Sequence, residues 1–442
     1  MQSDATRDTF VSAKHLSRVI MQQGRVALDA DHNEQVAIFW HYLRALAQDV
    51  IGAPGAPAAG GGFALTLEGN ELRISNGRYY VDGILVENEA SCLYTAQPSY
   101  PLPEDDPLAN LDKLKADATL FVYLDVWEQH VTWIEDGSLR EVALGGPDTC
   151  TRAKVVWQVR AAPYEGGEGN NGAPDCTQEL SHLVEIGNAQ LAAQVDPGAV
   201  RDDPCVMAPE SKYRGPENQL YRVEIHRPGD VRTPATFKWS RDNGSVLTAL
   251  NGIRGNDLEV ASTRGFEAGD WVELTNDDSD LRGEPGILAR VANVQDGALS
   301  LDPDEVPFFD VDTAANLHPK VRRWNQTSSE DIVLVDGAVP VTESPKDGKR
   351  VWIDLEDGVQ IVFSTGGQYR SGDYWLIPAR VATGKIEWPS MGGKGKADDL
   401  LPPRGIRHHY APLGFVTWDG KALGLAEGCR RTFRPAPNLT GQ

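Results

Sequence analysis

Apolar residues recur with helical spacing in one stretch near the N-terminus, whereas elsewhere they mostly alternate with polar residues in short runs. Asp31 or Asn33 can cap the first turn of the helical stretch. Gly52 and Pro54 can end it, because glycine is favoured just after a helix and proline cannot continue one. The pattern therefore predicts a single long helix over residues 33–51.

One face of this predicted helix carries an apolar seam. Its members are Val36, Phe39, Trp40, Leu43, Leu46, Ala47 and Val50. The seam suits packing on the chain's own β-domain, and it suits equally an inter-subunit bundle, since two heptads are too few to identify a coiled coil. Residues 53–62 contain only Gly, Ala and Pro, which predicts a flexible linker and favours an assembly helix within an N-terminal arm, residues 1–52.

After this linker, short alternating runs separated by Asn-Gly and Asp-Gly turns predict strands and hairpins. The expected fold is mainly β and multidomain, with β-sandwich and small-barrel units and one N-terminal α-helix. The expected parts are a β-rich domain (63–248) with an exposed loop (163–175), a small β-barrel-like unit (249–308) and a C-terminal β-domain (309–442). Strands that we expect inside the first of these include 140–144 and 183–186.

Length and charge narrow the class of protein. With 442 residues, of which 40% are hydrophobic, the chain can bury the cores of two to four domains. A formal net charge of −22 would repel nucleic acid and an anionic membrane surface. No run of 18 apolar residues occurs, and the first residues lack the pattern of a signal peptide. We expect a protein made in the cytoplasm that neither inserts into a membrane nor binds nucleic acid.

The five cysteines show no CxxC spacing, so the sequence has neither a zinc-ribbon nor a thioredoxin motif. Cys176 and Cys205 are candidates for a disulfide if the protein meets an oxidising exterior. Reduced, buried thiols are the default for a chain without a signal peptide.

Signatures of catalysis are absent: the sequence contains no HExxH, GxSxG or Walker loop. We therefore predict no enzymatic activity, cofactor or resident metal, and the adjacent His408 and His409 point to opposite faces of a strand. The acidic runs 277–280 and 302–305 could supply calcium ligands, although solvated turns explain them as well. A carboxylate pair for glycoside hydrolysis stays open, because its separation is a tertiary property.

Aromatic residues are frequent in the last third of the chain. Three are candidates for stacking on sugar rings: Trp352, Tyr369 and Trp375. Filling the core of a β-sandwich is the alternative role for the same side chains.

Several segments resemble a bacterial family of unknown function. They are residues 10–35 with their Gln-Gln-Gly-Arg-Val-x-Leu-Asp-Ala-Asp core, 123–128, 140–149, 237–246 and 372–380. Members of that family look like companions of phage-tail-like contractile injection systems. Residues 76–83 are also similar to a β-turn pattern of phage baseplate and tail-fibre proteins. The resemblance implies a context and carries over no catalytic residues.

The sequence thus predicts a structural component of a contractile injection system: an adaptor, baseplate accessory or fibre-like element. Its partners would be other subunits of a particle that stays in the cytoplasm or is released, and cyclic symmetry favours a homotrimer. The alternative is a carbohydrate-binding module that recognises a surface glycan. A polysaccharide hydrolase is a third, weaker alternative.

Overall fold

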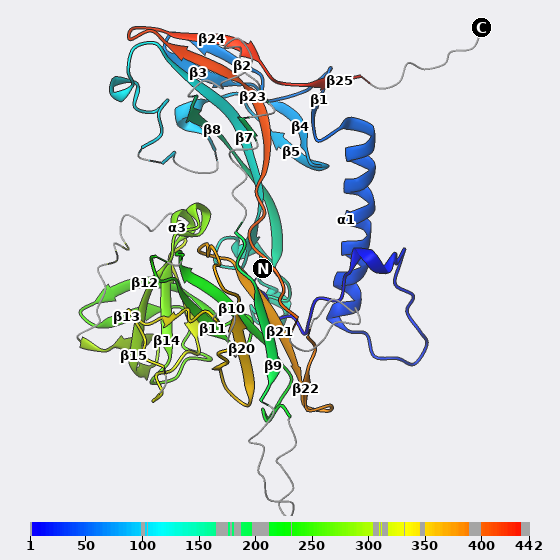
Figure 1. The fold of residues 1–442 in the computed structure, drawn as a ribbon, viewed down its shortest axis with the longest axis vertical. Helices are drawn as coiled ribbons and strands as arrows, with labels where there is room; N and C mark the ends of the chain where they lie inside the picture. The colour runs from blue at the N-terminus through cyan, green and yellow to red at the C-terminus, as the bar shows by residue number, and fades with distance from the viewer. Residues whose placement is uncertain are drawn as a thin grey trace, which may run out of the picture. The chain divides into compact units, whose positions relative to one another are not determined.

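The computed structural model describes residues 2–98, 102–103, 105–164, 176, 179–180, 187–196, 212–230, 232–303, 309, 311, 317–330, 332–344, 350–388 and 399–434. It is mainly β and divided into several sheets, as the sequence predicts (Figure 1). The chain forms two compact units, each described by itself: unit 1 contains 1–38, 130–152 and 187–406, and unit 2 contains 39–129, 153–186 and 407–442. No helix in the described part of the chain is long and apolar enough to cross a membrane.

Unit 1 contains two sheets that share one apolar core. The larger sheet has the order β18 (Val339–Pro340), β11 (Thr236–Ser240), β10 (Gln219–Arg227), β21 (Tyr374–Arg380) and β22 (Lys385–Ile386). The smaller one is formed by β19 (Ile353–Asp354), β20 (Val359–Phe363) and β9 (Leu191–Val195). Aromatic and β-branched side chains of both sheets, including Phe237, Phe363 and Trp375, pack together between them.

A small closed barrel is the second part of unit 1. Its strands, in spatial order, are β12 (Leu247–Arg254), β13 (Asp257–Val260), β16 (Ala298–Leu301), β15 (Ile287–Gln295), β14 (Trp271–Thr275) and β17 (Lys320–Trp324). The sequence predicts four of these strands and a unit that ends at residue 308. The boundary is wrong because β17, a run rich in lysine and arginine, closes the barrel between β14 and β12.

Unit 2 holds three further sheets around its own core. Their orders are β25 (Thr432–Phe433), β1 (Pro54–Pro57), β4 (Gly77–Val81), β5 (Ile84–Asn88); then β2 (Leu65–Glu68), β3 (Glu71–Ile74), β6 (Cys92–Leu93); then β24 (Leu423–Gly428), β23 (His409–Trp418), β7 (Ala118–Val131), β8 (Arg152–Pro163). The predicted hairpins at residues 65–74 and 77–88 are confirmed. Because β23 pairs with β7, neither 63–248 nor 309–442 forms a unit by itself.

Two α-helices and several single 3₁₀ turns have both of their ends within the described part of the chain. The elements are α1 (Asp29–Ile51), α3 (Asp277–Arg282), η1 (Ser12–Lys14), η2 (Tyr94–Ala96), η3 (Leu111–Lys113), η4 (Gly137–Leu139) and η5 (Val142–Leu144). The strand predicted at 140–144 is therefore wrong: η5 occupies it, and Glu141 caps that turn by accepting from the backbone N–H of Ala143. The strand predicted at 183–186 and residues 165–175 of the predicted loop lie outside the described residues.

The predicted linker at 53–62 is also corrected. Residues 54–57 form β1, which pairs with β4 on one side and with β25 on the other, and the side chain of Ala56 is fully buried. Small residues here allow close approach of neighbouring backbones: a Cβ on Gly62 would lie 2.6 Å from the backbone of Gly77. The absence of large side chains reflects tight packing in this segment rather than freedom to move.

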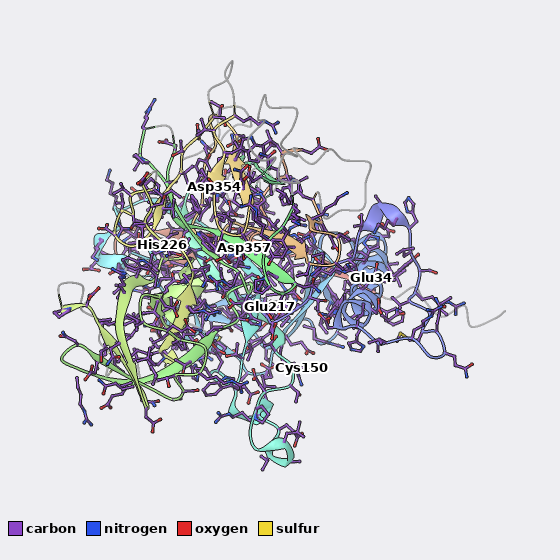
Figure 2. All side chains as sticks on the ribbon, turned by 90° about the horizontal axis from the view of Figure 1, so that it is seen from below. Glu34, Cys150, Glu217, His226, Asp354 and Asp357 are labelled. Carbon is purple, nitrogen blue, oxygen red and sulfur yellow. A yellow bond between two sulfur atoms is a disulfide. The ribbon has the colours of Figure 1, made fainter. Side chains whose placement is uncertain are left out.

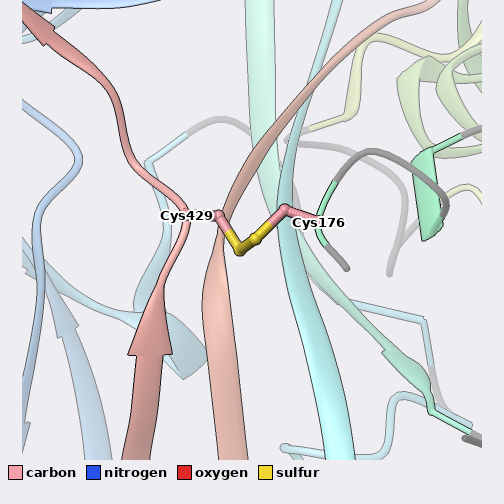
Figure 3. Close-up of a disulfide and its surroundings, with 2 residues drawn as sticks. All are labelled: Cys176 and Cys429. Carbon is pink, nitrogen blue, oxygen red and sulfur yellow. A yellow bond between two sulfur atoms is a disulfide. The ribbon is translucent and has the colours of Figure 1, made fainter. Parts of the chain in front are cut away.

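Unit 2 contains one disulfide, between Cys176 and Cys429 (Figure 3). The sequence offers Cys205, which lies outside the described residues, as the candidate partner of Cys176. That pairing is wrong because Cys176 is bonded to Cys429. The sequence separation of 253 residues explains the error, since only the fold brings these two cysteines together. The sulfurs lie in a small aromatic cluster that includes Phe121, Tyr123 and Phe415.

Candidate assembly interface

The helix α1 begins at Asp29, four residues before the predicted start. Its first turn forms early because the carbonyl of Leu28 accepts hydrogen bonds from the N–H groups of Asp31 and His32. The carboxylate of Asp29 accepts from both the backbone N–H and the hydroxyl of Thr6, at 2.8 and 2.7 Å. Burial raises the pKa of Asp29, but these hydrogen bonds outweigh it and lower the pKa overall. Acidic residues in the first turn also suit the positive end of the helix dipole.

The C-terminal half of α1 is fastened to unit 2 along one side. Arg44 pairs with Glu128 at 3.1 Å and lies over the ring of Trp40, 5.5 Å from its centre. Gly83, in the turn between β4 and β5, lies so close that a Cβ there would be 2.5 Å from the carbonyl oxygen of Arg44. At the end of the helix, the N–H of Gly52 donates to the carbonyl of Gln48, as the predicted glycine stop requires.

The other side of α1 is exposed, and it is the side that carries the apolar seam. The α1 stripe, as we name it, consists of Val36, Phe39, Trp40, Leu43, Leu46, Ala47 and Val50. Six of its seven side chains are exposed, by fractions between 42% at Val36 and 73% at Val50, and Ala47 is half-buried. Only Ala30 and Ile38 of the whole helix are buried. Within the described residues of unit 2, the seam therefore does not pack on a β-sheet, which is one of the two roles that the sequence allows.

The α1 stripe has no charged member, although the chain carries a net charge of −22. On a helix with 3.6 residues per turn, the seven positions fall within roughly 60° on either side of Leu43. Glu34, the acidic residue labelled on α1 in Figure 2, lies outside this arc. Soluble proteins rarely expose contiguous apolar surface of this kind unless it binds something. The stripe thus has the composition of an interaction surface.

The segment before α1 extends from a well-anchored start into an exposed stretch. Two hydrogen bonds hold the backbone of residues 2–10 within unit 1: Asn243 donates to the carbonyl of Ser3 (2.8 Å), and Arg380 donates to the carbonyl of Thr6 (2.9 Å). Two ion pairs hold its side chains: Arg7 with Glu387 (2.7 Å) and Asp8 with Arg404 (2.6 Å). The apolar side chains of the next stretch are exposed: Leu16, Ile20, Met21, Val26 and Leu28. Val19 is tied to α1, because its backbone N–H donates to Gln35 at 2.8 Å. Residues 11–28 are therefore attached through residues 2–10, through Val19 and through α1 itself, while most of their apolar side chains stay exposed.

The three residues predicted to stack on sugar rings do not form a binding surface. Tyr369 and Trp375 are buried in the core of unit 1, with exposed fractions of 4% and 2%. The indole N–H of Trp375 donates to the carbonyl of Leu401 at 2.9 Å, so even its polar edge is occupied. Trp352 is half-buried. The rings of Tyr369 and Trp375 fill the core of a β-sandwich, which is the alternative role, and the sugar-stacking prediction is wrong for these two residues.

Unit 1 contains a buried ionic cluster, where the large sheet meets the barrel, that the amino-acid pattern does not predict. Its members, Arg222, Glu224, Lys238 and Glu273, are all at least nine-tenths buried. Lys238 pairs with Glu273 at 2.5 Å and with Glu224 at 3.1 Å, and Glu224 pairs with Arg222 at 2.5 Å. Alternation of charged and apolar residues along β10 and β11 is typical of a solvated face, and only the packing of the barrel shows that the face is buried.

The electrostatics of this cluster keep its carboxylates ionised. Burial alone raises the pKa of Glu224, but Arg222 and Lys238 outweigh it and lower the pKa to about 2. The pKa of Glu273 is also lowered against the effect of burial, chiefly by Lys238. His226, which Figure 2 labels, lies 3.7 Å from Glu273, and burial together with Lys238 lowers its pKa to about 4. Each charge has a partner, which is the arrangement of a structural cluster.

The first acidic run, for which the sequence allows either a solvated turn or calcium ligands, is the helix α3, whose N-cap is Asn276. Its carboxylates each have a protein partner: Asp277 contacts the imidazole of His318 (2.6 Å), Asp278 pairs with Arg282 (3.0 Å) and Asp280 pairs with Lys320 (2.7 Å). Across the described residues, no group of three or more His, Cys, Asp or Glu side chains is arranged to hold a metal ion. The histidines at 408 and 409 each face a different carboxylate, Asp125 at 2.7 Å and Asp82 at 2.8 Å.

Comparison with known proteins assigns the chain to one protein family. A model of a family of unknown function, DUF6519, matches residues 1–169 and 175–439, almost the whole chain. No curated protein and no solved structure matches the chain.

Proposed function

We propose a structural role for this chain, which belongs to the DUF6519 family of unknown function. In this proposal the protein is a subunit of a larger particle and joins it through the α1 stripe, with copies of itself as the first partners. The observation that carries the proposal is the exposure of Phe39, Leu43 and Leu46 on an uncharged helix face. Transferring such side chains out of water stabilises an interface by roughly 1.5–3 kcal/mol each when burial is complete.

The kind of particle is a further part of the proposal. The motifs at residues 10–35 and 372–380 support a contractile injection system, in which the protein would act as an adaptor, baseplate accessory or fibre-like element. The N-terminal motif covers the exposed segment before α1 and the first turns of the helix, so it ends directly before the α1 stripe begins at Val36. Cyclic symmetry of a cytoplasmic or released particle leads to the expectation of a homotrimer, whereas the proposal itself requires only self-association through the stripe. No catalytic step is part of the proposed role.

A substitution in the middle of the α1 stripe tests the proposal. Leu43→Asp places a charge at the centre of the stripe, and its desolvation would oppose any apolar contact there. We expect the wild type to self-associate at micromolar concentration and the variant to be monomeric. The measurement is the mass in solution by light scattering after size exclusion, at several protein concentrations.

The matched control is Gln48→Asp, which introduces the same charge at an exposed position of α1 outside the stripe. It should keep the wild-type mass, and both variants should keep the wild-type circular dichroism and melting temperature. A wild type that stays monomeric, or a Leu43→Asp protein with unchanged mass, would contradict assembly through the stripe.

A further inference from the structure

The α1 stripe is symmetric about Leu43. Its other members lie three, four and seven residues away on both sides: Trp40 and Leu46, Phe39 and Ala47, Val36 and Val50. When two helices pair antiparallel about a twofold axis, a residue that lies n positions before the axis faces the residue n positions after it on the partner. Reversing this helix about Leu43 therefore places every stripe position opposite another stripe position.

The sizes of the paired side chains are complementary in this arrangement. Phe39 faces Ala47, so the bulkier member of the pair meets the smallest side chain of the stripe, and Trp40 faces the smaller Leu46. Val36 faces Val50, and Leu43 lies on the axis against its own copy. Each level of the interface then holds one larger and one smaller residue or two of equal, moderate size, which is how well-packed interfaces fill space.

A parallel bundle distributes the same side chains unevenly. Every level would hold identical residues, so that Trp40 meets Trp40 and, two turns on, Ala47 meets Ala47. The level of Trp40 would be overfilled, and the level of Ala47 would leave a void. Each of these packing defects typically lowers the stability of an interface by more than about 1 kcal/mol. Packing therefore opposes the parallel trimer expected from particle symmetry.

The charge of the protein and the symmetry of a twofold contact also favour a second copy of the chain as the partner that covers the α1 stripe. Two surfaces from a protein with a net charge of −22 repel one another unless they meet through an uncharged patch, and the stripe is such a patch. A twofold contact uses the same surface on both chains and closes on itself, leaving no open stripe. Arg44, which flanks the stripe, is already paired with Glu128 of its own chain.

We propose that two copies of this chain pair their α1 stripes antiparallel, with Leu43 on the twofold axis. The inference rests on the proposed assembly through the stripe and adds the partner, the direction and the register. It predicts a dimer as the building unit. Val36 and Val36 of the partner subunit would be about 21 Å apart along the helix axes, because each lies seven residues from the twofold axis at about 1.5 Å per residue.

Cysteine cross-linking distinguishes the two directions. The background is the full chain with Cys92, Cys150 and Cys205 changed to serine, and the reagent is a short bis-maleimide. Leu43→Cys should cross-link to a dimer in high yield. Val36→Cys and Val50→Cys should give little product as single variants, whereas the double variant should cross-link well, since these positions face each other across the axis.

Every outcome of this experiment decides one of the two proposals. Cross-linking of both single variants at Val36 and Val50, in a protein that still self-associates, would overturn the antiparallel register and leave assembly through the stripe intact. A monomeric wild type with no Leu43→Cys product would overturn both. Gln48→Cys, exposed but outside the stripe, is the control and should cross-link no more than the background protein.

Discussion

Single residues in unit 1 show how charges are accommodated between a sheet and a barrel. The ammonium group of Lys238 pairs with the carboxylates of Glu224 and Glu273 and lies 4.4 Å from the ring of Trp324, so buried protein groups supply its partners. Removing one member of such a cluster leaves an uncompensated buried charge, which is far more costly than losing the whole cluster. The imidazole of His226 beside it is held neutral, since burial and Lys238 both oppose its protonation.

The lowered pKa of His226 predicts acid sensitivity of unit 1. The pKa is about 4 in the folded state and 6.5 as a reference for the unfolded chain, so between these values the unfolded chain binds more protons. Stability from this group is therefore present above pH 6.5 and falls as the pH falls towards 4, by roughly 2 kcal/mol between pH 7.5 and 5. His226→Gln should reduce that loss, as measured by urea unfolding followed by tryptophan fluorescence at the two pH values.

His32→Gln is the control for this experiment, because His32 lies on the exposed surface of α1. Its acid-dependent loss should equal that of the wild type. If His226→Gln loses as much stability as the wild type on acidification, the acid sensitivity has another origin.

At the level of helices and strands, the residues of a tight turn determine where two neighbouring strands form a hairpin. The two-residue turn at Asp82 and Gly83 has positive φ at both positions, 48° and 76°, which is the geometry of the tight hairpin that an Asp-Gly pair favours. The predicted hairpin between β4 and β5 is confirmed for that reason. The same turn has a second role that its sequence does not show, since Gly83 is a contact of unit 2 with the backbone of α1 at Arg44.

Gly83→Ala should therefore cost more than an ordinary glycine substitution in a hairpin. An alanine costs about 1–2 kcal/mol in the left-handed backbone conformation. Here its Cβ would also lie 2.5 Å from the carbonyl oxygen of Arg44, so α1 must shift away. We expect a lower melting temperature and faster hydrogen exchange in the C-terminal half of α1.

Gly69→Ala separates these two costs. Gly69 has φ of +64° in the turn between β2 and β3, and nothing lies within 4 Å of a Cβ placed there. It should lower the melting temperature less and leave hydrogen exchange in α1 unchanged. Equal effects of the two variants would mean that the contact between Gly83 and α1 contributes nothing.

In the molecule as a whole, each unit is assembled from separate parts of the chain. Unit 2 takes its sheet β24-β23-β7-β8 from strands that lie near residues 118–163 and near the C-terminus. The disulfide between Cys176 and Cys429 joins the same two regions and closes a loop of 253 residues (Figure 3). A covalent link between distant segments stabilises mainly by restricting the unfolded chain.

Cys429→Ser should consequently destabilise unit 2, by about 2–4 kcal/mol under oxidising conditions. The wild type with added reductant should unfold like the variant, and the variant should not respond to reductant. Thermal unfolding with and without dithiothreitol measures both effects. Cys150→Ser, which removes an exposed free thiol, is the control, and a Cys429→Ser protein as stable as the oxidised wild type would contradict the stabilising role.

Local periodicity and turn chemistry encode the features of this protein that the amino-acid pattern predicts correctly. The helix, its apolar seam around Leu43, its glycine stop and the hairpins with Asp-Gly turns all follow from residues within a few positions of one another. The seam is the basis of the proposed interface, and helical spacing alone identifies its members. The helix starts at Asp29, before the predicted residue, because the carbonyl of Leu28 accepts from the first turn. Thr6, more than twenty residues away, holds the carboxylate of Asp29 by two hydrogen bonds that it donates.

Contacts between segments distant in sequence account for the features that the pattern does not predict. They make a strand of the predicted linker by pairing β1 with β25, close the barrel with the charged strand β17, join Cys176 to Cys429 and bury Trp375 in a core. The fold also leaves the α1 stripe exposed. The physical reason is the same in each case: burial and pairing are properties of two segments, and a pattern along one segment carries no information about the other.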